Sequence, residues 1–157
     1  SLAEKGFTSL FDGKTLKGWI HGAGDIDHWA PTDGWKLSYD GKSQAKDKNL
    51  WTEDEFGDFV LIVDTRQPGK PPLVRAPVLL PAEVPHGMTP LVDADNPPGR
   101  WSRFVITAVD NTVTVVLNGK TVIEKAKLPG IPRKKPIALR HHGDPIQFAN
   151  IYIKELN

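Results

Sequence analysis

Two adjacent histidines, His141 and His142, end a segment with the composition of a β-strand, IALRHHGDP at residues 137–145. Side chains of neighbouring strand residues point to opposite faces, so the two rings are predicted to diverge. His141 is expected to turn toward the layer between two sheets, and His142 to join Arg140 on an open face. The alternation separates two sets of side chains: Ile137, Leu139 and His141 against Ala138, Arg140 and His142.

His142 and Arg140 together suit the removal of a proton next to a carbonyl group. Histidine has an ordinary pKa of about 6.5, which lets it act as a general base at neutral pH. An arginine two residues away on the same face can stabilise the oxyanion that forms. Two other interpretations stay open: His142 as a residue that stabilises the strand end, and Arg140 as one half of a surface ion pair.

A second pair of candidates lies in the segment LWTEDEF, at residues 50–56. Glu53 and Trp51 are two positions apart, so they share a face of an extended chain. Glu53 is a candidate for an acid–base set, and Trp51 is a candidate for stacking on a ring of a ligand. The alternative for Glu53 is a solvated acidic turn at positions 53–55, and the alternative for Trp51 is a tryptophan packed in the core.

Three further residues are candidates for substrate binding: Arg66, His141 and Asp144. Asp64 shares a strand face with Arg66, so the alternative for Arg66 is an ion pair with Asp64. For His141 the alternative is a hydrogen-bonded core histidine, and for Asp144 it is a turn residue before a proline. The other tryptophans are predicted to pack in the core or at strand ends: Trp19, Trp29, Trp35 and Trp101.

Composition limits the class of protein. A chain of 157 residues fits one domain over residues 1–157. The net charge of +1 creates no basic field for nucleic acid, and no apolar run approaches the length of a membrane span. The absence of cysteine excludes disulfides and a cysteine nucleophile. The histidines are dispersed and no phosphate-cradling glycine loop is present, so neither a metal nor a cofactor is predicted.

Short runs rich in valine, isoleucine, threonine and aromatic residues alternate with glycine and proline, which is typical of strands and turns. Asn118-Gly119 can adopt the positive φ values of a type I′ turn, so residues 112–125 are predicted to form a hairpin. Many close strands without helical intervals predict an all-β antiparallel sandwich or barrel, with the two termini close together. The predicted strands are 59–65, 101–109, 112–117, 121–125, 136–142 and 146–156.

The middle of the chain, residues 67–99, contains nine prolines. Proline cannot donate to a sheet ladder, so this stretch is predicted to be an irregular excursion that adds at most short edge strands. It is either a surface loop or one wall of a ligand cleft.

Four segments together resemble the 3-keto-disaccharide hydrolase domain family. They are GFTSLFDGKTLKGW (6–19), LWTEDEFGDFVLIVDTR (50–66), GRWSRFVITAVDNTVTVVLNGKTVIEKAKLPGIP (99–132) and PIALRHHGDPIQFANIYIKEL (136–156). The resemblance implies a two-sheet antiparallel jelly roll similar to concanavalin A-type lectins and glucanases. It also implies an exported bacterial protein, periplasmic or extracellular, whose partner is an oxidised sugar or oligosaccharide.

One segment of the family pattern is missing. Such domains usually carry an Asn/Asp-Ser-Gly-Ile segment after the strand DFVL…DTR, and here the proline-rich stretch stands in its place. Three functions therefore stay open: a hydrolase that cleaves 3-keto-glycosides, a lectin-like module that binds carbohydrate without turnover, and a structural or interaction domain. In the first, His142, Arg140 and Glu53 are the predicted catalytic residues, with Trp51, Arg66, His141 and Asp144 around the substrate.

Overall fold

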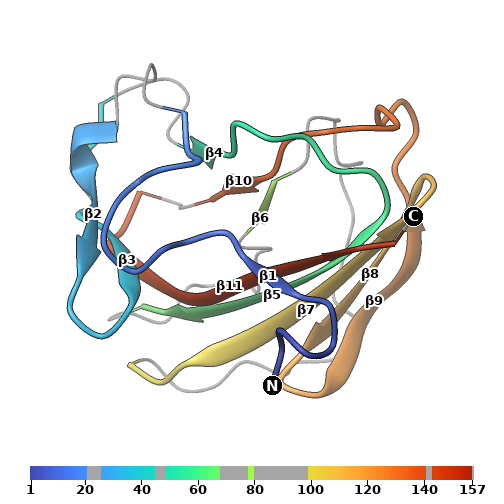
Figure 1. The fold of residues 1–157 in the computed structure, drawn as a ribbon, viewed down its shortest axis with the longest axis horizontal. Helices are drawn as coiled ribbons and strands as arrows, with labels where there is room; N and C mark the ends of the chain where they lie inside the picture. The colour runs from blue at the N-terminus through green and yellow to red at the C-terminus, as the bar shows by residue number, and fades with distance from the viewer. Residues whose placement is uncertain (21–25, 45–48, 68–77, 80–98, 141–142, 157) are drawn as a thin grey trace.

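The protein is an antiparallel β-sandwich of one large and one small sheet (Figure 1). The computed structural model describes residues 1–20, 26–44, 49–67, 78–79, 99–140 and 143–156. The large sheet has the strand order β2 (Trp29–Thr32), β3 (Lys36–Tyr39), β11 (Ile146–Glu155), β5 (Phe59–Arg66), β7 (Ser102–Val109), β8 (Thr112–Leu117) and β9 (Lys120–Lys127). An additional short strand, β1 (Thr8–Ser9), pairs with β11. The small sheet has the order β4 (Leu50–Trp51), β10 (Ala138–Leu139), β6 (Val78–Leu79). A 3₁₀ turn at Ile26–His28 precedes β2.

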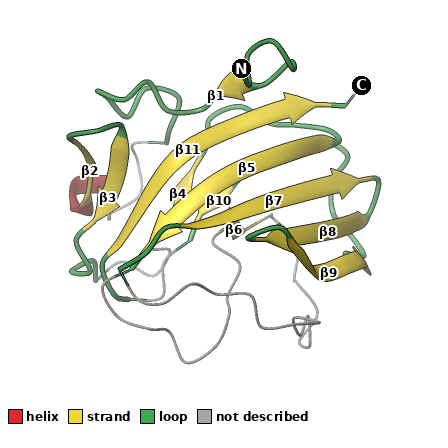
Figure 2. Ribbon diagram, turned by 90° about the horizontal axis from the view of Figure 1, so that it is seen from below, coloured by secondary structure: helices red, strands yellow, loops and turns green. Residues whose placement is uncertain are grey.

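The core lies between the two sheets, and the alternation of side chains along each strand builds it. On β5, Phe59, Leu61 and Val63 are fully buried in the core, whereas Asp64 and Arg66 belong to the opposite side. We call the side of each sheet that faces away from the other sheet its outer face. Figure 2 looks onto the outer face of the large sheet, with β4, β10 and β6 behind it.

The predicted all-β fold is confirmed, including its clearest local features. Strands β8 and β9 form a hairpin that turns at Asn118 and Gly119, with φ values of 50° and 82°. Those positive values at both central positions are what a type I′ turn requires. The chain ends are also neighbours, because Thr8 of β1 pairs with Ile153 of β11.

The proline-rich stretch contributes one described strand, β6, which pairs with β10 at the edge of the small sheet. This agrees with the predicted short edge strand; residues 68–77 and 80–98 lie outside the described residues. The strand predicted over residues 136–142 was too long, since β10 spans only Ala138–Leu139. Its partners β4 and β6 have two residues each, so the ladder ends where they end.

None of the described segments forms a helix long and apolar enough to cross a membrane.

Four short strands were not predicted from the sequence, because each has only two to four residues: β1, β2, β3 and β4.

Candidate functional site

Two of the predicted site residues, Trp51 and Arg140, lie on the outer face of the small sheet. Trp51 pairs with Ala138 across β4 and β10, and the two-residue period puts Arg140 on the same side of the chain. The extended chain continues past Trp51, because the amide of Glu53 donates to the carbonyl of Gly18 at 2.8 Å. Glu53 itself begins the bend at residues 53–54, so its sharing of a face with Trp51 stays a prediction. Trp51 and Arg140 are half-buried, and Glu53 is exposed.

The face is not open along its whole length. Ile137 and Leu139 join the core as predicted, but Ala138, expected on an open polar face, is fully buried. β10 is the middle strand of the small sheet, and neighbours on both sides can cover so short a side chain. The accessible part of this face therefore begins at Arg140. The predicted divergence of His141 and His142 falls outside the described residues.

Arg66, at the end of β5, is held on the outer face of the large sheet. Its Nε and Nη2 donate to the side-chain oxygen of Gln147 at 2.9 and 2.5 Å. The guanidinium carbon lies 4.7 Å from the centre of the Trp101 ring, within the range of a cation–π contact. An amide and an indole thus orient the charge of Arg66 without neutralising it.

A shallow pocket of about 430 Å³ adjoins Arg66. Arg66 and Gln147 supply polar groups to a wall that is otherwise mainly apolar, which is the usual make-up of a small-molecule site. Asp144 is exposed and precedes Pro145, which lines the pocket, so it lies beside the rim. The residues around the pocket are Ser38, Tyr39, Arg66, Gly99, Pro145, Ile146 and Gln147.

The connection from β10 to β11 crosses from the small sheet to the large sheet beside this pocket, although the outer faces of the two sheets point in opposite directions. Arg140 and Asp144 are four residues apart, so their Cα atoms are at most about 14 Å apart. The segment that joins β10 to β11 therefore links Arg140 to the pocket rim. The predicted site divides into two clusters, Trp51 and Arg140 in one and Arg66 and Asp144 in the other.

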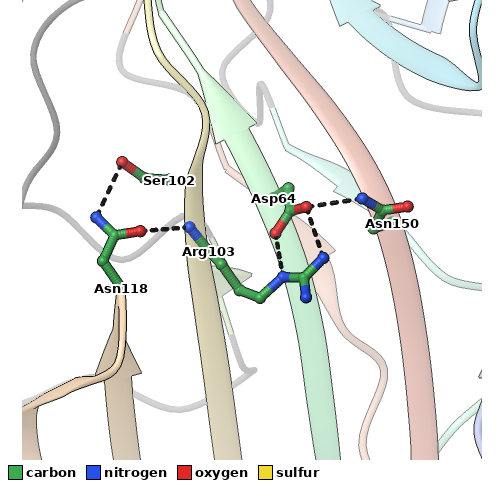
Figure 3. A network of polar contacts seen from close by, with 5 residues as sticks. All are labelled: Asp64, Ser102, Arg103, Asn118 and Asn150. Atoms are coloured by element: carbon green, nitrogen blue, oxygen red, sulfur yellow. Dashed lines mark hydrogen bonds and ion pairs between the residues drawn. The ribbon is translucent and has the colours of Figure 1, made fainter. Parts of the chain in front are cut away.

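A polar network on the large sheet was not anticipated (Figure 3). Asp64 is only 8% exposed and accepts hydrogen bonds from Nε and Nη2 of Arg103 at 2.8 and 3.0 Å. The Asn150 amide donates to the same carboxylate at 2.7 Å. The hydrogen bonds that Arg103 donates to Asp64 raise the pKa of Arg103. Asp64 thus pairs with Arg103 rather than with Arg66, and the alternative considered for those two residues is wrong.

Figure 3 also shows how the hairpin turn is attached to β7. The amide of Arg103 donates to the side-chain oxygen of Asn118 at 2.9 Å, and Asn118 contacts the hydroxyl of Ser102 at 3.4 Å. These contacts anchor the end of β7 next to Trp101, the ring on which Arg66 lies. No local sequence signal could have shown them, because they depend on the register between strands.

The tryptophans are divided between the core and the surface. Trp19 and Trp29 are buried, as predicted, and Trp101 is half-buried at the start of β7. Trp35 was predicted to pack in the core or at a strand end; it is 56% exposed and so not in the core, but it lies at a strand end, directly before β3, and contacts Phe11. It lies in the turn between β2 and β3, where the chain leaves the sheet.

Within the described residues, no group of three or more histidine, aspartate and glutamate side chains lies close enough together to hold a metal ion. Among these residues His28 contacts Asp40, with Nδ1 at 3.0 Å from a carboxylate oxygen, and this hydrogen bond lowers the pKa of Asp40. Both side chains are partly exposed at the base of the β2–β3 hairpin.

Comparison with solved structures shows the same fold in three proteins from Parabacteroides distasonis ATCC 8503 that are provisionally named glycosyl hydrolases. One is 18% identical with a TM-score of 0.73, and the match covers 99% of this chain and 96% of that one. A second is 22% identical with a TM-score of 0.70, covering 96% and 84%. A functionally unknown protein from Saccharomyces cerevisiae is 12% identical with a TM-score of 0.56, covering 96% and 100%. At these identities the likeness concerns the fold.

No functionally curated protein matches the chain. The family comparison is more specific: the 3-keto-alpha-glucoside-1,2-lyase-like domain matches residues 6–83 and 80–154. The two matched parts meet inside the proline-rich stretch and together include every predicted site residue. This supports a carbohydrate-active protein. The chain belongs to the 3-keto-alpha-glucoside-1,2-lyase-like domain family.

Proposed function

We propose that this protein cleaves glycosides of 3-keto sugars, by elimination across carbons 1 and 2 followed by addition of water. The observation that carries the proposal is the family match, which covers residues 6–83 and 80–154. The strand register adds support, because it brings Trp51 and Arg140 to one face of the small sheet.

The chemistry follows from the ketone. A carbonyl at carbon 3 acidifies the hydrogen on carbon 2, so a base can remove that proton and leave an enolate whose charge lies on the carbon 3 oxygen. The enolate reforms the ketone as the bond from carbon 1 to the glycosidic oxygen breaks, and an acid protonates the departing oxygen. Water then adds across the new double bond, with its hydroxyl on carbon 1 and a proton on carbon 2.

Each step needs one kind of side chain, and the chain offers a candidate for each. His142 is the proposed base, and Arg140 is the proposed cation for the enolate oxygen. Glu53 is the proposed acid for the leaving group, and it is exposed two positions after Trp51. Trp51 offers an indole for the sugar ring, and its half-buried position lets it act as a fixed wall.

A substrate that extends along the connection from β10 to β11 would place its remaining part in the pocket beside Arg66. Arg66 offers charged donors to hydroxyl groups, while Tyr39 and Ile146 of the pocket wall provide apolar contact. Asp144, which is exposed beside the pocket rim, is the proposed partner for a further hydroxyl group.

The direct test is incubation with a 3-keto-disaccharide, with release of both free sugars measured by chromatography and the enediolate chromophore measured by absorbance. His142→Ala should lower turnover by roughly 10²–10⁴-fold, the usual effect of a lost acid–base group. His141→Ala is the matched control: as a residue predicted to face the core, it should lower the melting temperature more than turnover. Equal turnover in wild type and His142→Ala would refute the assignment.

A second function, carbohydrate binding without turnover, is favoured by one observation. Within its described lining, the pocket beside Arg66 contains no histidine and no carboxylate, so that part of the site is built to hold a ligand. A wild-type protein that binds the unoxidised disaccharide in calorimetry, yet leaves the 3-keto form intact, would decide for this alternative.

A further inference from the structure

Trp35 differs from the other four tryptophans in its exposure. Trp19 and Trp29 are at most 3% exposed, and Trp51 and Trp101 are half-buried, but Trp35 is 56% exposed. An indole is the largest apolar side chain, and leaving it in water gives up the free energy of burial, about 25 cal/mol for each Å². Among the described residues, Trp35 is the most exposed large hydrophobic side chain.

The backbone at Trp35 also carries a cost. Thr32 and Lys36 are the last pair of the β2–β3 ladder, so the turn between them has three residues. Gly34 and Trp35 both have positive φ, 80° and 59°. A glycine adopts such values freely, but a bulky side chain does so at a cost of about 1–2 kcal/mol. Trp35 thus occupies a position where glycine or asparagine would fit with less strain.

The indole is held against the N-terminal segment by one of its faces. A Cβ placed on Gly13 would lie 2.5 Å from Cε2 and 2.8 Å from Cε3 of Trp35, and closer still to Cδ2. Cδ2 and Cε2 form the bond that the two rings share, so a group can be near both only from above the ring plane. Phe11, a core residue, contacts the indole edge-on with ring centres 6.4 Å apart. The exposed surface of Trp35 therefore lies on the opposite ring face and the rim.

We propose that Trp35 is a stacking platform for a sugar ring, separate from the candidate active site. One face of the indole is fixed on Gly13 and the other is open, which is the geometry that the apolar face of a pyranose needs. The platform requires no rearrangement before binding, because Phe11 and Gly13 already set the ring orientation. Such preorganisation reduces the entropic cost of binding.

The size and surroundings of the platform favour a sugar over a protein partner. A stable protein interface buries about 800 Å² on each side, far more than one indole offers. The neighbours of Trp35 in the turn are polar, with Thr32, Asp33 and Lys36 exposed or half-exposed. A single ring with polar groups beside it matches one monosaccharide unit, whose hydroxyl rim needs polar partners. The choice of a sugar rests on the proposed function of the protein.

The platform can be tested by binding of unmodified oligosaccharides, namely maltohexaose, cellohexaose and laminarihexaose, followed by calorimetry and by quenching of tryptophan fluorescence. At least one of them should bind wild type, and Trp35→Ala should weaken that binding roughly tenfold. Trp35→Phe should retain part of the affinity. Thermal melts of both variants show that the fold is kept, as expected for a side chain in an exposed turn.

Gly13 supplies a sharper test with a matched control. Gly13→Ala should weaken binding as Trp35→Ala does, because the new methyl group would displace the indole. Gly130→Ala introduces the same backbone strain, with φ of 80° against 81°, but its Cβ would meet nothing within 4 Å. It should bind like wild type. Equal binding in Gly13→Ala and Gly130→Ala, or unchanged binding in Trp35→Ala, would overturn the platform.

The outcome also separates this inference from the proposed function. Trp35→Ala should turn over a 3-keto-disaccharide at the wild-type rate, because the residue is not part of the reacting face. If binding depends on Trp35 but the protein shows no turnover, the proposed enzymatic function is contradicted and the platform is supported. If the protein turns over the 3-keto-disaccharide but binds none of the three oligosaccharides, the platform is contradicted and the enzymatic function is supported.

Discussion

Two arginines on the outer face of the large sheet are held in opposite ways. Arg103 donates to both oxygens of Asp64, so a carboxylate neutralises its charge. Arg66 donates to the amide of Gln147 and lies over the ring of Trp101, and within the described residues it forms no ion pair. Asp64 and Arg66 are only two positions apart on β5, yet one completes a closed network and the other borders a pocket. The difference indicates that Arg103 stabilises the sheet and that Arg66 is available to a ligand.

Strand β11 supplies an amide to each arginine site, and a β-bulge makes this possible. The register between β11 and β5 shifts between Ala149 and Tyr152, and Asn150 has a φ of 50°. Phe148 and Ile151 both face the core, so without the extra residue Asn150 would face the core as well. The bulge turns Asn150 outward to Asp64. Asparagine tolerates this left-handed conformation better than most side chains.

The comparison predicts that the closed network matters for stability. Asp64→Ala removes the acceptor of three hydrogen bonds, and leaves Arg103 and Asn150 without their shared partner. We expect the free energy of unfolding to fall by about 2 kcal/mol, after allowance for the exposure of Arg103. Urea unfolding measures this change. Asp64→Asn keeps the shape of the side chain and loses the charge, so the free energy of unfolding should fall less. Equal stability of Asp64→Ala and wild type would show that the network does not stabilise the fold.

The same comparison shows what could be predicted from the sequence. The hairpin at Asn118 follows from a local rule on positive φ, and this prediction is confirmed. The shared face of Asp64 and Arg66 follows from alternation along the strand. The pairing of Asp64 with Arg103 joins residues 39 positions apart, and the pairing with Asn150 spans 86 positions. Such contacts depend on strand order and on the bulge, which no local pattern reveals. Proximity along β5 suggested Arg66 as the partner of Asp64, but the partner is Arg103, its neighbour across the strands.

Exposure was harder to predict than strand positions. The sequence around Trp35 contains the turn signal Asp33-Gly34, but an aromatic residue is usually interpreted as core. The orientation of its ring depends on Gly13, which reaches the β2–β3 turn only through the path of the N-terminal segment. On β10, alternation correctly assigned Leu139 to the core. It could not show that Ala138 is covered, because that depends on strands on both sides.

A matched substitution of the two arginines separates binding from stability. Arg66→Met keeps the aliphatic stem against Trp101 and removes the donors, so we expect the KM for a 3-keto-disaccharide to rise roughly tenfold with a smaller change in kcat. Its stability should change by less than about 1 kcal/mol, the usual limit for an exposed polar contact. Arg103→Met should do the reverse, lowering stability and leaving KM unchanged. An unchanged KM in Arg66→Met would mean that the pocket does not hold substrate.

Lys135 provides a third cation for the comparison, because it also lies near an aromatic ring but borders neither pocket nor carboxylate network. It is 1% exposed, its Nζ donates to the carbonyl of Gly57 at 2.9 Å, and it lies 5.5 Å from the centre of the Phe59 ring. Burial lowers the pKa of Lys135 below its ordinary value of 10.5, although the charge of Asp58 opposes the shift. The Lys135 ammonium is therefore a structural cation, and keeping it charged while buried costs free energy of folding.

This cost predicts how stability depends on pH. Between the lowered pKa of folded Lys135 and its ordinary value of 10.5, the unfolded chain binds more protons than the folded one. The free energy of unfolding that Lys135 contributes must therefore rise as the pH rises through this window. Lys135→Met keeps an unbranched side chain over Phe59 without the charge, so it should remove this rise and flatten the pH profile. Urea unfolding of wild type and variant from pH 7 to 10.5 makes the comparison, and parallel profiles would show that the buried ammonium carries no such cost.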